Sequence, residues 1–123
     1  MPILGRDESI VLERDAVYEG GGGIKIPGRK KGKLILTNKR IIFEYTQGLI
    51  SKKTFTPLDE PISKIRNVSS EGIISKKLVI EFERVGGERG YGRTGRVKFS
   101  TSNVNEWIRE IKILVTEKRE AES

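Results

Sequence analysis

Apolar residues recur in short runs and at every second position over much of the chain, and the clearest runs lie near its centre. Residues 34–36 and 41–43 are two apolar runs that flank the polar sequence Thr-Asn-Lys-Arg. Runs rich in aliphatic, β-branched and aromatic residues on either side of a turn-like break predict a β-hairpin. Asn38 suits the turn, because asparagine tolerates a positive φ angle and can hydrogen-bond its own backbone.

Further short strands are predicted on both sides of this hairpin, most of them from the same two-residue period. They cover residues 10–18, 49–56, 65–71, 77–84 and 96–100. Four consecutive glycines at 20–23 predict a break after the first strand. The remaining connections are predicted as a basic loop at 24–31, a proline-containing loop or helical turn at 57–61, and a glycine-rich hairpin loop at 85–95.

The period changes near the end of the chain, where apolar residues recur at the spacing of one helix face. They are Val104, Trp107, Ile108, Ile111, Leu114 and Val115. Asn103 is a natural N-cap, and Glu106 three residues later completes a variant of the capping box. A helix this short is only marginally stable alone, so we expect it to pack on the sheet, with Trp107 in the core.

Seven short strands followed by one helix, with no helix between strands, predict an antiparallel sheet. The fold class is therefore mainly β with one C-terminal α-helix. A sandwich or partly open barrel, with the amphipathic helix over its open end, accommodates these elements. A length of 123 residues fits one domain over residues 1–123. We expect its core to span about residues 10–118, between tails that fray.

Cysteine and histidine are both absent, which excludes disulfides, thiol nucleophiles and the commonest general base and metal ligand. The acidic residues show no metal-loop spacing. The glycine run at 20–23 lacks the Gly-Lys-Ser/Thr ending of a phosphate-binding loop. We therefore predict a protein that is not an enzyme and uses no cofactor or metal. A hydrolase built on acids and lysine alone is the unsupported alternative.

The N-terminal sequence carries acids where a signal peptide needs an apolar run. Pro2 occupies the position where N-myristoylation requires glycine. No apolar stretch approaches the ~18 residues of a membrane span. These features predict a cytoplasmic protein that can also sit peripherally at a membrane.

Charge is segregated along the chain more strongly than its net value of +7 indicates. Residues 20–58 contain one acid, Glu44, and nine basic residues. The nine are Lys25, Arg29, Lys30, Lys31, Lys33, Lys39, Arg40, Lys52 and Lys53. Such asymmetry predicts an anionic partner that these nine side chains bind. Two simpler interpretations stay open. In the first, the nine basic residues form a solvated surface that binds no partner. In the second, Thr37, Asn38 and Arg40 build the turn, with Arg40 paired to a carboxylate.

Residues 32–43, Gly-Lys-Leu-Ile-Leu-Thr-Asn-Lys-Arg-Ile-Ile-Phe, resemble the signature of GRAM-type and bacterial or archaeal PH-like domains. In those families a Gly-x-Leu-x-Leu-Thr-Asn-x-Arg run precedes an apolar strand. Residues 61–65 and 107–111 resemble a later step and the final helix of the same domains. The resemblance, over about residues 10–115, implies a seven-stranded split barrel capped by the helix, and a binding rather than catalytic role.

In the phosphoinositide-binding PH domains, basic residues of the loop between the first two strands hold the lipid headgroup. The resemblance implies that Lys31 and Lys33 match their two-residue spacing. Lys33, however, stands where that family prefers arginine, and lysine lacks the planar fork that grips phosphate.

Together these features predict an interaction module for an anionic membrane surface, a lipid headgroup or an acidic protein segment; it could also form homo-oligomers. The alternative is a nucleic-acid-binding β-barrel. Its motivation is the basic composition and the sequence Arg-Gly-Tyr-Gly-Arg at 89–93, which resembles arginine-glycine segments that bind RNA. A hairpin tip is the simpler interpretation of that segment.

Overall fold

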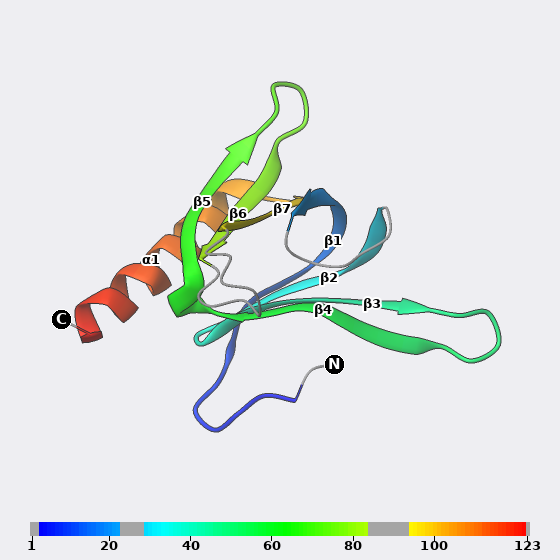
Figure 1. The fold of residues 1–123 in the computed structure, drawn as a ribbon, viewed down its shortest axis with the longest axis horizontal. Coiled ribbons are helices and arrows are strands. Elements are labelled where there is room, and N and C mark those ends of the chain that lie inside the picture. Colours follow the sequence, from blue (N-terminus) through cyan, green and yellow to red (C-terminus); the bar gives the residue numbers. More distant parts are fainter. Residues whose placement is uncertain (1–2, 23–28, 84–93, 123) are drawn as a thin grey trace.

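The computed structural model describes residues 3–22, 29–83 and 94–122 (Figure 1). Its elements, in chain order, are β1 (Ile10–Gly22), β2 (Lys30–Thr37), β3 (Arg40–Gln47), β4 (Lys53–Pro61), the short 3-10 helix η1 (Ile62–Lys64), β5 (Ile65–Glu71), β6 (Lys77–Glu83), β7 (Thr94–Thr101) and α1 (Val104–Glu122).

The seven strands form one antiparallel sheet in the order β4-β3-β2-β1-β7-β6-β5. Strand β1 joins the two halves, because it pairs with β2 along one edge and with β7 along the other. Register shifts in β1, between Ile10 and Leu12 and between Tyr18 and Gly20, bend the strand. The sheet therefore curls, and β5 and β6 rise across the direction of β3 and β4 in Figure 1. The predicted fold class is confirmed.

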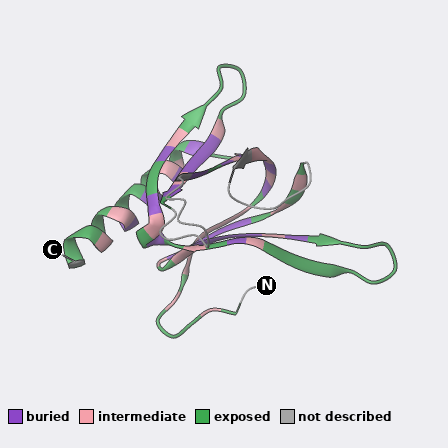
Figure 2. Cartoon of the chain, in the orientation of Figure 1, coloured by how far each residue is buried: buried purple, intermediate pink, exposed green. Residues whose placement is uncertain are grey.

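The core lies where the curled sheet meets the helix, as the purple segments of Figure 2 show. Apolar side chains of β2, β3, β6 and β7 face inward, and Phe43 and Phe99 lie 5.0 Å apart between ring centroids. Helix α1 contacts β5, β6 and η1, and it buries Trp107 completely. The apolar side chains that predicted the strands and those that predicted α1 therefore pack together in one core.

Two predictions of irregular structure are wrong. The glycine run does not end β1, which continues to Gly22 with Gly21 opposite Val97 and Gly22 opposite Arg96. Glycine backbones still offer the N–H and C=O groups that a neighbouring strand needs, and the positive φ of Gly20, 124°, falls at the β1 bulge.

The predicted loop at residues 57–61 is also β structure, because β4 runs through both prolines to Pro61. The strand predicted at 49–56 begins later than expected, since residues 49–52 belong to the connection and β4 starts at Lys53. Strand β4 is at the edge of the sheet, where a proline's missing N–H leaves no ladder bond unmade. The helical turn follows it, at η1. The predicted loops at 24–31 and 85–95 lie largely outside the described residues, although Lys30 and Lys31 already belong to β2.

Gly32 is a glycine whose identity the sheet requires. A Cβ atom there would lie 2.1 Å from the carbonyl oxygen of Glu44 on β3. Gly32→Ala should therefore lower the free energy of unfolding by about 1–3 kcal/mol, since the two backbones must separate. Urea denaturation measures the effect, with Gly5→Ala as control because its Cβ would meet only Glu8 at 3.6 Å. Equal stability of the two variants would contradict the close approach of β2 and β3.

Candidate functional site

The structure separates the candidate anion-binding residues into two groups at opposite ends of the β2–β3 hairpin. Strand β2 runs from Lys30 to Thr37 and β3 returns from Arg40, so Lys39 and Arg40 lie at the turn end. The other end holds Arg29, Lys30, Lys31 and Lys33, together with Lys52 of the β3–β4 connection and Lys53 at the start of β4. Lys25 is outside the described residues.

The turn end holds the segment at residues 3–9, and we call this arrangement the N-terminal latch. The Thr37 hydroxyl donates to Glu8 Oε2 at 2.6 Å, and the Asn38 amide donates to the Asp7 carbonyl oxygen at 2.9 Å. Asn38 Oδ1 in turn accepts from the Ser9 N–H at 2.9 Å. Lys39 Nζ donates to the carbonyl oxygen of Arg6 at 2.9 Å. Side chains of the Thr-Asn-Lys-Arg sequence therefore bind the protein's own backbone and carboxylates.

Arg40 completes the latch. Its Nε lies 2.8 Å from Glu8 Oε2, its Nη1 lies 2.8 Å from Asp59 Oδ2, and its Nη2 donates to the Ile3 carbonyl oxygen at 2.7 Å. The Glu8 side chain is only 3% exposed. Hydrogen bonding from Arg40 is the main reason that the pKa of Glu8 falls to about 2. This confirms that Arg40 pairs with carboxylates at the turn, so its guanidinium is already committed within the protein.

Arg29 is likewise paired. Its guanidinium binds the carboxylate of Glu19, which also accepts from the Ser100 hydroxyl and lies 3.4 Å from Lys77 Nζ. The hydrogen bond from Arg29 is the largest cause that lowers the pKa of Glu19 to about 2, followed by that from Ser100. Glu19 thus joins β1, β6 and β7 next to the start of β2.

Lys30 rests on an aromatic pair. Its Nζ lies 5.7 Å from the centroid of the Tyr45 ring, and Tyr45 stacks on Phe55 of β4 at 5.2 Å. Phe55 is 43% exposed, which leaves this cation–aromatic stack open to a partner.

The lysines of β2 differ in their cross-strand neighbours. Lys33 lies between Asp15 of β1 and Glu44 of β3, so two carboxylates offset its charge. Lys31 lies opposite Val17 and is exposed, beside an open hollow of about 480 Å³ that Lys33, Thr46 and other side chains also line.

Lys52 and Lys53 are exposed at the β3–β4 connection. With Lys30, Lys31 and Lys33 they form what we call the basic end of the sheet. Within the described ranges, Lys31, Lys52 and Lys53 make no ion pair.

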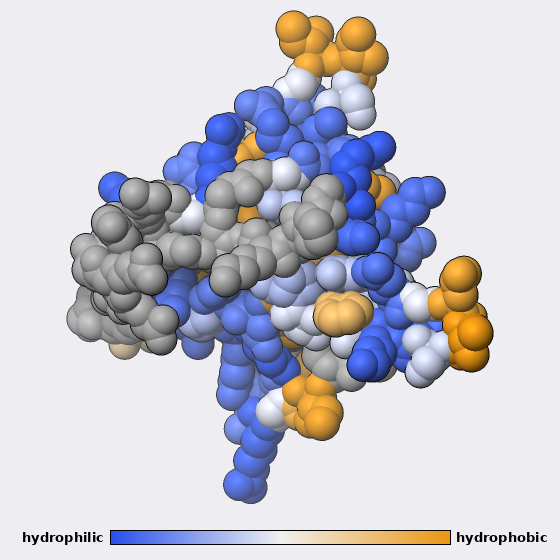
Figure 3. Space-filling model, turned by 45° about the vertical axis from the view of Figure 1, so that its right-hand side comes forward, coloured by the Kyte–Doolittle hydropathy of each residue, from blue (hydrophilic) through white to orange (hydrophobic). Residues whose placement is uncertain are grey.

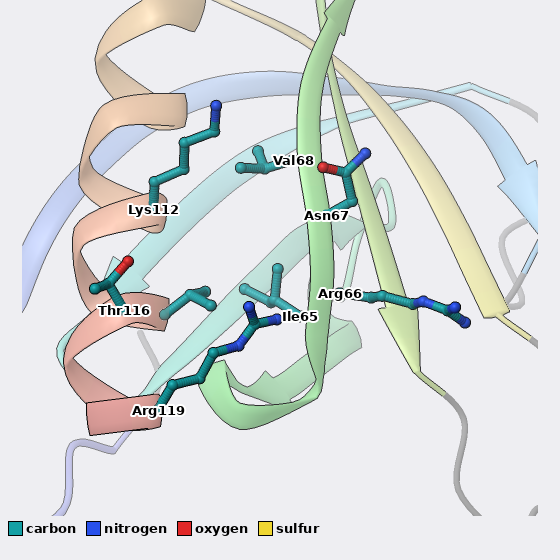
Figure 4. Close-up of a pocket in the computed structure, with 8 residues that line it drawn as sticks. Ile65, Arg66, Asn67, Val68, Lys112, Thr116 and Arg119 are labelled. Atoms are coloured by element: carbon teal, nitrogen blue, oxygen red, sulfur yellow. The ribbon is translucent and has the colours of Figure 1, made fainter. Parts of the chain in front are cut away.

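A second hollow, of about 200 Å³, lies between β5 and α1 (Figure 4). Ile65 and Val68 of β5 form an apolar floor, and Lys112 and Arg119 rise from α1. Arg66 points away from the helix in this view. The cations that line this hollow number fewer than the lysines of the basic end.

No group of three or more acids in the described part of the chain is arranged to hold a metal ion. Glu8 and Glu19, whose pKa values fall to about 2, stay ionised under neutral conditions and are held by cations. A carboxylate of such low pKa is a poor general acid or base at neutral pH. In the same described segments, no helix is long and apolar enough to cross a membrane.

Sequence reasoning missed two features. Glu8 was not recognised as the partner of Arg40, since nothing local links residues 32 positions apart. Also missed were the fully exposed aliphatic pairs of the hairpin turns at 48–51 and 72–75 and the likeness of the two turn sequences. Their sequences are nearly the same, so a search for internal repeats would have found them. The aromatic residue of the nucleic-acid alternative, Tyr91, lies outside the described residues.

Comparison with known proteins identifies the family. The family model described as vacuolar protein sorting protein 36, Vps36 of ESCRT-II, matches residues 1–84. A solved structure, "Vps36 N-terminal PH domain", is similar with a TM-score of 0.62 and 19% sequence identity; the match covers 94% of this chain and 87% of that chain. No curated protein is similar enough to match.

At this identity the structural likeness shows the fold alone, and it confirms the predicted PH-like architecture. The narrower GRAM-type assignment stays a prediction. Because the family model spans more than half of the sequence, this chain belongs to the Vps36 family.

Proposed function

We propose that this domain is a non-enzymatic interaction module whose basic end binds an anionic membrane surface. The observation that carries the proposal is the difference between the two ends of the β2–β3 hairpin. Arg40 and Lys39 are held by the N-terminal latch, whereas Lys31, Lys52 and Lys53 are exposed and make no ion pair with a described residue. The domain would then act peripherally, at the cytoplasmic surface of a membrane.

The strength of this attraction can be bounded. A lysine close to an anionic membrane contributes about 1 kcal/mol, so the five lysines of the basic end, of which Lys33 has acidic neighbours, supply at most about 5 kcal/mol. That free energy corresponds to a dissociation constant of about 0.2 mM. Charge at the basic end therefore steers the domain to the membrane, and stable residence needs a further contribution.

Co-sedimentation with vesicles tests the proposal through the triple variant Lys31→Gln, Lys52→Gln and Lys53→Gln. The loss of three surface lysines should weaken binding to vesicles of phosphatidylcholine and phosphatidylserine by about 100-fold at low salt. Binding to pure phosphatidylcholine should be weak for both proteins, and added salt should reduce the difference between them.

The matched control removes three cations elsewhere, Lys112→Gln, Lys118→Gln and Arg119→Gln on α1, and should bind as the wild type does. Equal losses in the two triple variants would mean that only net charge matters. A larger loss in the α1 variant would move the site to the groove between β5 and α1. Binding to an acidic peptide but not to vesicles would replace the membrane with a protein partner.

A further inference from the structure

Two hairpin turns of the sheet carry almost the same six-residue sequence. Residues 48–53 read Gly-Leu-Ile-Ser-Lys-Lys, and residues 72–77 read Gly-Ile-Ile-Ser-Lys-Lys. The first sequence connects β3 to β4 and the second connects β5 to β6. The two hairpins belong to opposite edges of the sheet, so the repeat does not arise from pairing between them.

The two turns also share one backbone geometry. Gly48 has a φ of 132° and Gly72 a φ of 110°, both in the region that favours glycine. A Cβ at Gly48 would lie 2.2 Å from the Ser51 carbonyl oxygen, and one at Gly72 would lie 2.3 Å from the Ser75 carbonyl oxygen. Each turn is therefore a tight loop in which the two residues after the glycine form the apex.

Both apices are apolar and fully exposed. Leu49, Ile50 and Ile73 have relative exposures of 101%, and Ile74 has 100%. They are the orange groups at the right and at the top of Figure 3. Tight turns usually carry glycine, asparagine, aspartate or serine, so a pair of large aliphatic residues at each apex is unexpected for a turn facing only water.

Lysines follow each apolar pair at the same distance along the chain. Lys52, Lys53 and Lys76 are exposed and make no ion pair with another described residue, whereas Lys77 approaches Glu19. Each turn thus presents an apolar apex with cations immediately behind it. That order matches the layers of an anionic membrane, in which hydrocarbon lies beneath a negatively charged headgroup surface.

The placement of the turns suits a broad surface rather than a groove. In Figure 1 the β5–β6 hairpin extends upward and the β3–β4 hairpin extends to the right, and the start of β2 lies between their tips in this view. A partner protein would need two separate pockets for two convex apices. A bilayer accepts both apices anywhere on its surface.

We propose that these turns are twin membrane-insertion tips, in which Leu49–Ile50 and Ile73–Ile74 enter the acyl boundary of an anionic bilayer while the following lysines contact lipid phosphates. The proposal rests on the proposed membrane function and adds the apolar contribution that charge alone does not supply. It also adds the β5–β6 hairpin, which the basic end does not include.

Site-directed labelling tests insertion directly, because the chain has no native cysteine. Ser51→Cys and Ser75→Cys place an environment-sensitive dye next to each apex and keep all four aliphatic residues. Glu117→Cys on the exposed side of α1 is the control. With vesicles of equal parts phosphatidylcholine and phosphatidylserine, emission from both tip dyes should shift to the blue and be quenched by nitroxide-labelled acyl chains. The dye at position 117 should do neither.

Affinity gives the second measurement. The double variants Leu49→Ser with Ile50→Ser, and Ile73→Ser with Ile74→Ser, should each bind the same vesicles about tenfold or more weakly, and their combination about 100-fold or more. Ile113→Ser, which removes an exposed aliphatic residue from α1, should leave binding unchanged.

The possible failures are distinguishable. If the wild type binds anionic vesicles but the tip dyes stay in water and the serine variants bind normally, insertion is wrong and the proposed membrane function survives. If the wild type binds no anionic vesicle, both proposals are wrong. If the serine variants instead abolish a dimer seen by sedimentation, the apices contact a second copy of the chain, and insertion is overturned.

Discussion

Arg40→Met should lower the free energy of unfolding by about 3 kcal/mol or more at neutral pH. The substitution keeps an apolar stem of similar length but removes the cation that neutralises Glu8, whose side chain is 3% exposed. Removing one partner of a buried ion pair leaves the other charge uncompensated, which typically costs about 3–5 kcal/mol. Urea denaturation measures the change. Arg6→Met is the control, because the Arg6 side chain is exposed and Arg6 contacts the latch through its backbone carbonyl oxygen, which the substitution keeps.

The pH dependence separates this ion pair from a general loss of packing. The pKa of Glu8 in the folded protein is about 2, below its ordinary value of 4.5, mainly because Arg40 donates a hydrogen bond to it. A lowered pKa contributes stability that is complete above about pH 4.5 and disappears as the pH falls toward 2.

The stability difference between wild type and Arg40→Met should therefore shrink as the pH is lowered through this range. Glu19, whose pKa is also about 2, titrates in both proteins and cancels. A difference that does not change with pH would contradict the role assigned to the ion pair.

Trp107→Ala should cost about 3–5 kcal/mol of stability, the usual range for removing a buried aromatic ring. Trp107 is fully buried on α1, the element that closes the curled sheet at η1, β5 and β6. Because this is the chain's one tryptophan, unfolding should be followed by far-ultraviolet circular dichroism rather than by fluorescence.

Ile113→Ala is the matched control on the same helix, since Ile113 is 44% exposed. It should lower the free energy of unfolding by well under ~1 kcal/mol, because alanine has a higher helix propensity than isoleucine and little buried apolar area is lost. Similar costs for both variants would mean that α1 is not anchored to the sheet through Trp107.

The fold was predictable because its signals are local. The apolar runs in residues 32–45 and the helical stripe from Val104 each indicate which side chains face the core, and most of these side chains are buried. The errors occurred where backbone pairing, rather than side-chain pattern, decides the structure. Gly21 and Gly22 belong to β1 because β7 pairs with them, and Pro57 and Pro61 are tolerated because β4 is an edge strand.

The candidate site was harder to predict, because a run of cations does not reveal which of them already have partners. Arg29 and Arg40 look equivalent to Lys31 and Lys52 in the sequence. Glu19 and Glu8, ten and 32 residues away, distinguish them only after folding. The Thr-Asn-Lys-Arg sequence, on which the family resemblance rests, likewise has partners that only the fold reveals, because it binds the segment at residues 3–9 in the N-terminal latch.

Nuclear magnetic resonance spectra recorded with and without anionic lipid nanodiscs test the central claim most directly, because every backbone amide reports separately. Signals from the start of β2 and from both hairpin turns should broaden or shift, while those of Thr37–Arg40 and α1 stay in place. Perturbations confined to the groove between β5 and α1, or to the N-terminal latch, would contradict the assignment of the membrane-facing side.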